Sequence, residues 1–260
     1  FRRELFRSGL GSSLATFCDV IYYTVITKKS NGLKNYNFKK TDFSKEHIKY
    51  IVNLSLPVSF QNIFLLVGFL SFVAITGLIG ITEQAATQAV ISTLFLSFMP
   101  CFGFGIAVQT LVSNSIGKGK KKLAKIFGYE AAKIATYYTL LLGLIFLFFP
   151  KYLLLIITTD KNIIEMAIVP MQVAGFSQIF YASGIVFANG LQAVGKTSFV
   201  MVAELLTNLL VFVPLAYIIG IHFEFGFNSA WIALPIYILL YSTLLWGKFR
   251  FGRWKTLKIF

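Results

Sequence analysis

A row of polar side chains lies inside one long apolar segment of the sequence. Gln178, Tyr181, Asn189 and Gln192 recur there, together with Ile185, at steps of three or four residues. That spacing places them on one face of an α-helix. Because polar groups are costly in hydrocarbon, we expect this face to look inward. It then either lines a binding cavity or supplies hydrogen bonds that hold neighbouring helices together.

Glu204 is the most internal ionisable residue of the chain. Asn208 follows it by one helical turn, and at 1.5 Å per residue Glu204 lies about 12 Å along the helix axis from Lys196. A carboxyl group at that depth is either a proton- or cation-linked group or an interfacial acid whose side chain reaches the water. The sequence leaves both interpretations open.

Three other ionisable residues are weaker candidates. Glu130 lies between Lys125 and Lys133 and is predicted to be interfacial, and His222 is predicted at an exposed helix end. Asp19 lies in the weakest of the apolar segments, where its role is ambiguous. None of the three competes with Glu204 as an internal charge.

Residues 190–197 match the phosphate-binding pattern GxxxxGK[ST] at every position. Such a loop cradles phosphates only between a β-strand and a helix. Here an uncharged apolar segment precedes it, and the one strand-like stretch that ends in an acid, residues 153–160, is predicted to be a loop on the opposite membrane face. We therefore predict a tight turn between two helices and keep a nucleotide-binding protein as a remote alternative.

Patterns for catalysis or metal binding are weak. The chain has 2 His residues, no Ser/His/Asp grouping and no metal-ligand spacing. Cys18 and Cys101, far apart in apolar segments, are predicted to be buried free thiols. We expect neither an enzyme nor a cofactor nor a bound metal.

The composition dictates the elements that must carry these residues. Hydrophobic residues make up 57% of the chain and charged residues only 13%, against roughly 25% in soluble domains. Four stretches (50–82, 84–117, 166–195 and 225–247) carry no charge, and each exceeds the ~20 residues with which a helix crosses a ~30 Å hydrocarbon core. Because backbone polar groups cannot stay unpaired in lipid, we predict an all-α integral membrane protein, a polytopic helical bundle. The candidate spans cover residues of about 9–27, 51–81, 85–116, 126–149, 167–193, 199–221 and 229–246, of which the first is the weakest.

The basic residues predict an orientation. If every span crosses once, 19 of the 24 Lys and Arg residues fall on one side. By the positive-inside rule this side, with the C-terminus, is cytoplasmic. The net charge of +14 therefore sits in short loops and the tail rather than on one solvated face with stacking aromatics, so no nucleic-acid partner is predicted.

Several short motifs follow one another in a characteristic order. They are GLIG, QAATQ, PCFGFGIA and LVSNSIGKG at residues 77–80, 84–88, 100–107 and 111–119, then NGLQAVGKT, VPLAY and GFNSAW at 189–197, 213–217 and 226–231. In order and spacing they resemble the C-terminal lobe of the multidrug and toxic compound extrusion (MATE) family. The resemblance runs from about Lys49 to the end, and residues 9–27 resemble the sixth helix of that family.

The resemblance implies twelve helices in two six-helix lobes that rock around a midplane cavity. This chain would then supply the last helix of the N-terminal lobe (1–27), a basic cytoplasmic linker (28–50) and the six-helix C-terminal lobe (51–260). Since the sequence begins at Phe1 rather than Met, we expect a fragment that lacks the rest of the N-terminal lobe.

The resemblance also implies export of amphipathic organic cations driven by inward movement of H+ or Na+. The sodium-coupled branch of the family places acids in its seventh and tenth helices, at positions that correspond here to Leu65 and Tyr181. Neither carries a negative charge near neutral pH. A coupling acid would therefore be Glu204 or lie in the missing lobe.

We therefore predict a secondary-active antiporter of drugs in the lipid bilayer of a bacterial cytoplasmic membrane, with aromatic rings offering π faces to a cationic substrate. The alternative is a flippase for lipid-linked oligosaccharide or polysaccharide from the same superfamily, which would need cationic residues in its central spans. A structural or channel-forming subunit is a third possibility. Glu204 is the possible ion-coupling residue, and the predicted cavity residues are Gln61, Phe64, Gln178, Tyr181, Asn189 and Asn208, with Phe180 as a further aromatic.

Overall fold

The computed structural model describes residues 2–29 and 45–252, and every element in these ranges is helical, with no strand among them. The chain divides into two compact units, residues 1–48 and 49–260. The first unit contains helix α1 (Arg2–Lys29), whose apolar stretch Ser13–Ile26 is shorter than the other candidate spans. Cys18 lies on it and is exposed, contrary to the prediction of a buried thiol, because few residues of this unit can cover it; Cys101 is buried as predicted.

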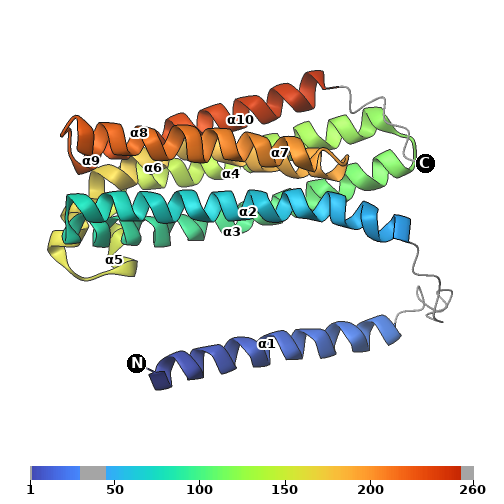
Figure 1. Cartoon of the computed structure of the whole chain (residues 1–260), viewed down its shortest axis with the longest axis horizontal. Helices are drawn as coiled ribbons and strands as arrows, with labels where there is room; N and C mark the ends of the chain where they lie inside the picture. Colours follow the sequence, from blue (N-terminus) through green and yellow to red (C-terminus); the bar gives the residue numbers. More distant parts are fainter. Residues whose placement is uncertain (1, 30–44, 253–260) are drawn as a thin grey trace. The chain divides into compact units, whose positions relative to one another are not determined.

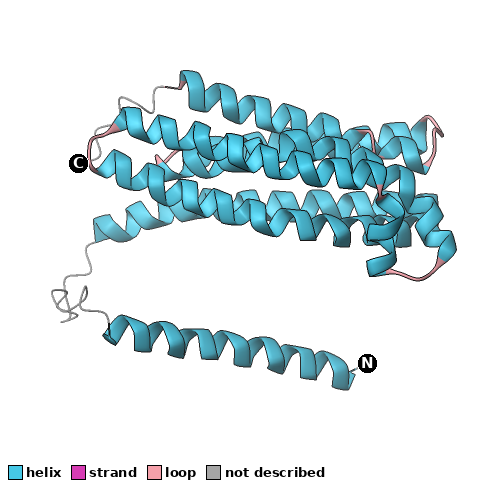
Figure 2. Ribbon diagram, turned by 180° about the vertical axis from the view of Figure 1, so that it is seen from behind, coloured by secondary structure: helices cyan, strands magenta, loops and turns pink. Residues whose placement is uncertain are grey.

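The second unit is a bundle of long helices that run side by side (Figures 1 and 2). Six helices of the described chain are long and apolar enough to cross a membrane, which confirms the predicted polytopic bundle. They correspond to six of the seven predicted spans; the weakest candidate, residues 9–27, is helical but its apolar stretch is too short to be counted with them. The bounds of the elements are α2 Lys45–Ile79, α3 Ile81–Gly117, α4 Lys121–Phe148, α5 Pro150–Ile157, α6 Lys161–Ala193, α7 Thr197–Glu204, η2 Leu205–Phe212, α8 Val213–Tyr217, η3 Ile218–His222, α9 Phe227–Ala230 and α10 Ala233–Phe251.

The turn after α6 explains the motif that imitates a phosphate-binding loop. α6 continues to Ala193, and Gly195 adopts a φ of 75°, a left-handed conformation that favours glycine. The backbone amide of Lys196 donates to the carbonyl of Leu191 at 2.9 Å, which closes the helix end. The predicted turn between two helices is confirmed, and the nucleotide-binding alternative has no strand to rest on among the described residues.

Two local features differ from the sequence-based prediction or were not anticipated by it. The loop predicted at residues 153–160 is wrong in its first part, because Pro150 starts a short helix, α5, that runs to Ile157. The sixth span is not a uniform α-helix, since it widens into the π-helical stretch η2 directly after Glu204. There the amide of Val213 donates to the carbonyl of Asn208, five residues back, next to Pro214, which has no amide hydrogen to donate.

Helix α6 lies at the centre of the second unit and packs against α3, α4 and α10. Its contact with α4 is closest where two glycines face each other: a Cβ on Gly143 would lie 2.6 Å from the carbonyl oxygen of Gly175. Close approach through small residues is typical of helix pairs in membranes, where van der Waals packing replaces the hydrophobic effect. One face of α6 is thereby fixed against α4, and its other faces remain available to line cavities.

Candidate functional site

A polar cavity of about 220 Å³ lies inside the second unit, between α2, α3, α6, α7 and α10. Its walls combine amide, hydroxyl and aromatic side chains with one carboxylate. The principal lining residues are Gln61, Asn62, Leu65, Phe102, Tyr181, Ile185, Asn189, Gln192, Glu204, Tyr237 and Tyr241. Glu204 is the single acid among them, and they include no lysine or arginine.

Glu204 is held by hydrogen bonds from two elements. Its side chain is only 2% exposed. Tyr237 Oη on α10 donates to Glu204 Oε1 at 2.7 Å, and Asn208 Nδ2, one turn along the same span, donates to the same oxygen at 3.1 Å. The side chains of Tyr241 and Gln61 also interact with this carboxyl group. Hydrogen-bond donors of this kind offset part of the cost of burying a carboxyl group.

A second hydrogen-bonded chain crosses the cavity from α6 to α10. Gln192 Nε2 donates to Gln61 Oε1 at 2.7 Å, and Gln61 Nε2 donates to Tyr241 Oη at 3.2 Å. Three helices are thus linked through the central Gln61 on α2. Gln61 and Tyr241 also interact with Glu204. A change of charge at Glu204 would therefore alter hydrogen bonds of α2, α6, α10 and the helix that carries Glu204.

The backbone at η2 and a glycine on α2 position Asn208. Asn208 is fully buried, and its side-chain oxygen has no hydrogen-bond partner among the described residues. A Cβ on Gly68 would lie 1.8 Å from that oxygen, so only glycine leaves room for the amide. The contact fixes the rotamer in which the Asn208 nitrogen points to Glu204.

The structure separates the predicted site residues into two groups. Gln61, Tyr181, Asn189 and Glu204 line the cavity, whereas Asn208 lies beside it as a partner of Glu204. The other three lie elsewhere. Gln178 is buried between α3 and α6, where Ser97 Oγ donates to its side-chain oxygen at 2.9 Å. Phe64 stacks on Phe60 with ring centroids 6.1 Å apart. Phe180 lines a separate groove between α4, α6 and α10. For Gln178, the geometry is that of an interhelical hydrogen bond.

Two tyrosines of α10 belong to the site although the sequence did not single them out. Tyr237 and Tyr241 are buried and lie one turn apart, so both hydroxyls reach the cavity from the same helix face. Their spacing of four residues inside an uncharged span was the available signal. This signal is weak, because aromatic residues in such spans are usually lipid-facing or packing residues.

The cavity combines one carboxyl group with neutral polar and aromatic side chains. The described residues include no group of three or more His, Cys, Asp or Glu side chains that could hold a metal ion. The residues that line the cavity offer one carboxyl group, several neutral donors and the ring of Tyr181, which stacks on Phe98 with ring centroids 4.2 Å apart. Leu65 and Tyr181, at the two positions that correspond to acids in the sodium-coupled branch, both line the cavity, so Glu204 is the only acid in its lining.

The fold and this cavity together define a multi-pass helical membrane protein that encloses a polar site within its own bundle. The MatE family model matches residues 57–218, more than half of the chain. The chain therefore belongs to the multidrug and toxic compound extrusion (MATE) family of membrane transporters, which confirms the resemblance seen in its motifs.

Individual relatives agree with this assignment. The chain is 28% identical over 207 residues to a probable multidrug resistance protein NorM of Thermotoga maritima, covering 80% of this chain and 45% of that protein. It is 25% identical over 256 residues to the uncharacterized transporter YisQ of Bacillus subtilis, covering 94% and 54%. A crystal structure of MATE in the straight conformation superposes with a TM-score of 0.82 at 17% identity, covering 94% of this chain and 55% of that one. The chain spans about half the length of the curated relatives it matches.

Proposed function

We propose that this chain forms one lobe of a secondary-active antiporter that exports amphipathic organic cations in exchange for H+ or Na+. The observation that carries the proposal is the single carboxylate, Glu204, buried in a polar cavity whose other lining groups are neutral. In a site of low dielectric such a charge attracts a cation far more strongly than it would in water. Intramembrane ionisable residues commonly mark the path of a substrate or an ion.

Exchange follows from competition for one charge. A proton or Na+ at Glu204 neutralises the carboxylate and weakens the attraction for an organic cation, whereas a bound organic cation disfavours the small ion. Each ligand thus lowers the affinity of the other, which is the thermodynamic requirement for antiport through one site. The hydrogen bonds that join the Glu204 span to α2, α6 and α10 would allow the binding or release of an ion at Glu204 to move several helices.

The open side of the cavity faces away from the core of the lobe. Asn62 and Phe102 line the cavity and are exposed, Phe102 to 40%. A second lobe docked on this side would complete the walls of the cavity and open it alternately to the two sides of the membrane. We propose that the whole protein is organised this way, in a bacterial cytoplasmic membrane with the C-terminus in the cytoplasm.

The cavity favours an organic cation over the anionic, lipid-linked sugar of a flippase. The residues that line it include no lysine or arginine to meet a phosphate, whereas Phe102 and Tyr181 offer aromatic faces. A cationic, planar dye is therefore the substrate class to test first.

The test is transport by the whole protein in sealed liposomes loaded with ethidium. An imposed H+ or Na+ gradient should drive ethidium movement against its own gradient, and dissipating the ion gradient should stop it. Ethidium movement that is the same with and without an ion gradient would contradict antiport.

A further inference from the structure

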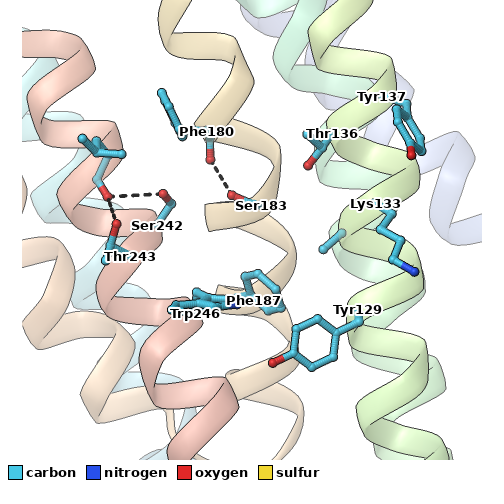
Figure 3. Close-up of a pocket in the computed structure, with 12 residues that line it drawn as sticks. Tyr129, Lys133, Thr136, Tyr137, Phe180, Ser183, Phe187, Ser242, Thr243 and Trp246 are labelled. Carbon is cyan, nitrogen blue, oxygen red and sulfur yellow. Dashed lines mark hydrogen bonds between the residues drawn. The ribbon is translucent and has the colours of Figure 1, made fainter.

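A second concave site lies on the opposite faces of two helices that also line the cavity. It is a groove of about 520 Å³ between α4, α6 and α10 (Figure 3). Along α6, Phe180, Ser183 and Phe187 face the groove, whereas residues of the other face look into the cavity. The wall formed by α6 and α10 therefore separates two sites, and the proposed transport function does not use the outer one.

The floor of the groove is apolar in its chemistry despite its hydroxyl groups. Ser183 Oγ donates to the carbonyl of Phe180 at 2.8 Å, and Ser242 and Thr243 donate to the carbonyl of Leu239 at 3.3 and 2.6 Å (Figure 3). Because these hydroxyls bond within their own helices, they offer few donors to a ligand. Most of the surface that remains consists of ring faces and methyl groups, with the hydroxyls of Tyr129, Thr136 and Tyr137 among them, and this surface suits a hydrocarbon chain.

The mouth of the groove is basic and carries the side chains typical of a membrane–water boundary. Lys133, with a side chain 61% exposed, lines the groove and pairs with Glu130 at 2.8 Å. Two further cations lie over lining rings: Lys125 Nζ is 5.7 Å from the Tyr129 ring centroid, and the Arg250 guanidinium is 5.1 Å from that of Trp246. Lys125 and Lys133, both on α4, thus bring two positive charges to this part of the groove, against the one negative charge of Glu130.

We propose that this groove binds an anionic phospholipid, with an acyl chain along α4, α6 and α10 and the phosphate at Lys133 and Lys125. Tyr and Trp rings beside basic side chains are the usual partners of headgroups at the bilayer surface. Clusters of Lys and Arg between or beside spans attract anionic lipids in the same way. An organic cation would be repelled at this mouth, so the groove and the cavity select opposite charges.

The test compares lipid retention by the whole purified protein in native mass spectrometry, with equal amounts of phosphatidylglycerol and phosphatidylcholine added. The wild type should retain phosphatidylglycerol in preference, and Lys133→Gln should reduce this preference on the order of fivefold. Lys122→Gln is the matched control, because Lys122 is exposed near the start of the same helix and does not line the groove. It should change the preference by less than about twofold.

A second variant tests the acyl-chain part independently. Thr136→Trp places a large ring in the groove, where Thr136 is a half-buried lining residue, and should remove one retained lipid of either type per protein. Equal retention of the two lipids by the wild type, equal losses in Lys133→Gln and Lys122→Gln, or unchanged retention in Thr136→Trp would each overturn the proposal. Ethidium transport plays no part in this readout, so its outcome is distinct from that of the transport test.

Discussion

The inner cavity and the outer groove share the helices α6 and α10 but differ in how deeply their charged side chains are buried. In the cavity, Glu204 is 2% exposed and its oxygen accepts hydrogen bonds from Tyr237 and Asn208. At the groove, the lining residue Lys133 and its partner Glu130 are more than half exposed and form an ion pair. A buried charge depends on every donor around it, whereas an exposed pair contributes little to stability.

This difference in burial predicts which substitutions should affect transport. Residues that touch Glu204 belong to α2, η2 and α10 and act as one network, so a small change in any of them should disturb transport. Residues at the mouth of the groove act through the surrounding lipid, so their loss should leave transport almost intact. The following substitutions test this contrast in order of decreasing effect.

Glu204→Gln should produce the largest loss. Glutamine keeps the shape but cannot carry the charge that attracts an organic cation, and we expect ion-driven ethidium transport to fall by at least about tenfold, or ~1.4 kcal/mol. Glu130→Gln is the matched control, because that acid is exposed on α4 and should change transport by less than about twofold. Equal effects of the two substitutions would break the distinction between a buried and an exposed acid.

Gly68→Ala should follow. The new methyl group would meet the Asn208 side-chain oxygen and force the amide away from Glu204, at a cost of about 1–3 kcal/mol that lowers both the melting temperature and transport. Gly103→Ala serves as control, since a Cβ at that position would meet no atom within 4 Å and alanine favours the α3 helix. A Gly68 variant with unchanged melting temperature and transport would show that Asn208 is not held by this contact.

Tyr237→Phe should have a moderate effect. It removes one hydrogen bond to Glu204 and keeps the ring, which lies 5.4 Å from that of Phe212, so we expect a loss of about 1 kcal/mol, or about fivefold in transport. The exposed Tyr217 provides the control, in which removal of the hydroxyl should change neither transport nor melting temperature. If both tyrosine variants behave alike, the hydroxyl of Tyr237 does not support the carboxylate.

Lys133→Gln should have the smallest effect on transport, less than about twofold, because the residue lies outside the cavity and its ion pair is exposed. The same liposome assay measures it, with a bilayer of fixed composition. A tenfold loss would instead place Lys133 in the transport mechanism and erase the contrast between the two sites.

The sequence predicted the architecture better than the site, for a physical reason. The four charge-free stretches are longer than a membrane span and leave a helix as the only solution, so four of the six long helices could be expected on this ground. The other two, Lys121–Phe148 and Thr197–His222, carry internal charges and were predicted from their apolar composition. Gly195 and its turn also follow from local chemistry. The widening at η2 does not, because a proline such as Pro214 removes one backbone donor but does not by itself fix the pattern of the hydrogen bonds before it.

Within the site, helical spacing correctly grouped Tyr181 and Asn189, which both line the cavity together with Glu204. Spacing within one helix cannot tell which neighbour a side chain meets, and for this reason Gln178 is found bonded to Ser97 instead. The contribution of Tyr237 required knowledge of how α10 packs beside α7. Partners across helices are set by tertiary packing, which periodicity in one segment does not encode.

The central claim is that Glu204 provides the charge that holds the organic cation and is shared with the coupling ion. Ethidium binding to the purified whole protein, followed by fluorescence anisotropy with and without added Na+ and at several pH values, tests it most directly. The wild type should bind ethidium and release it on addition of H+ or Na+, whereas Glu204→Gln should bind at least about tenfold more weakly and no longer respond to either ion. Equal affinity and an equal ion response in the two proteins would contradict it.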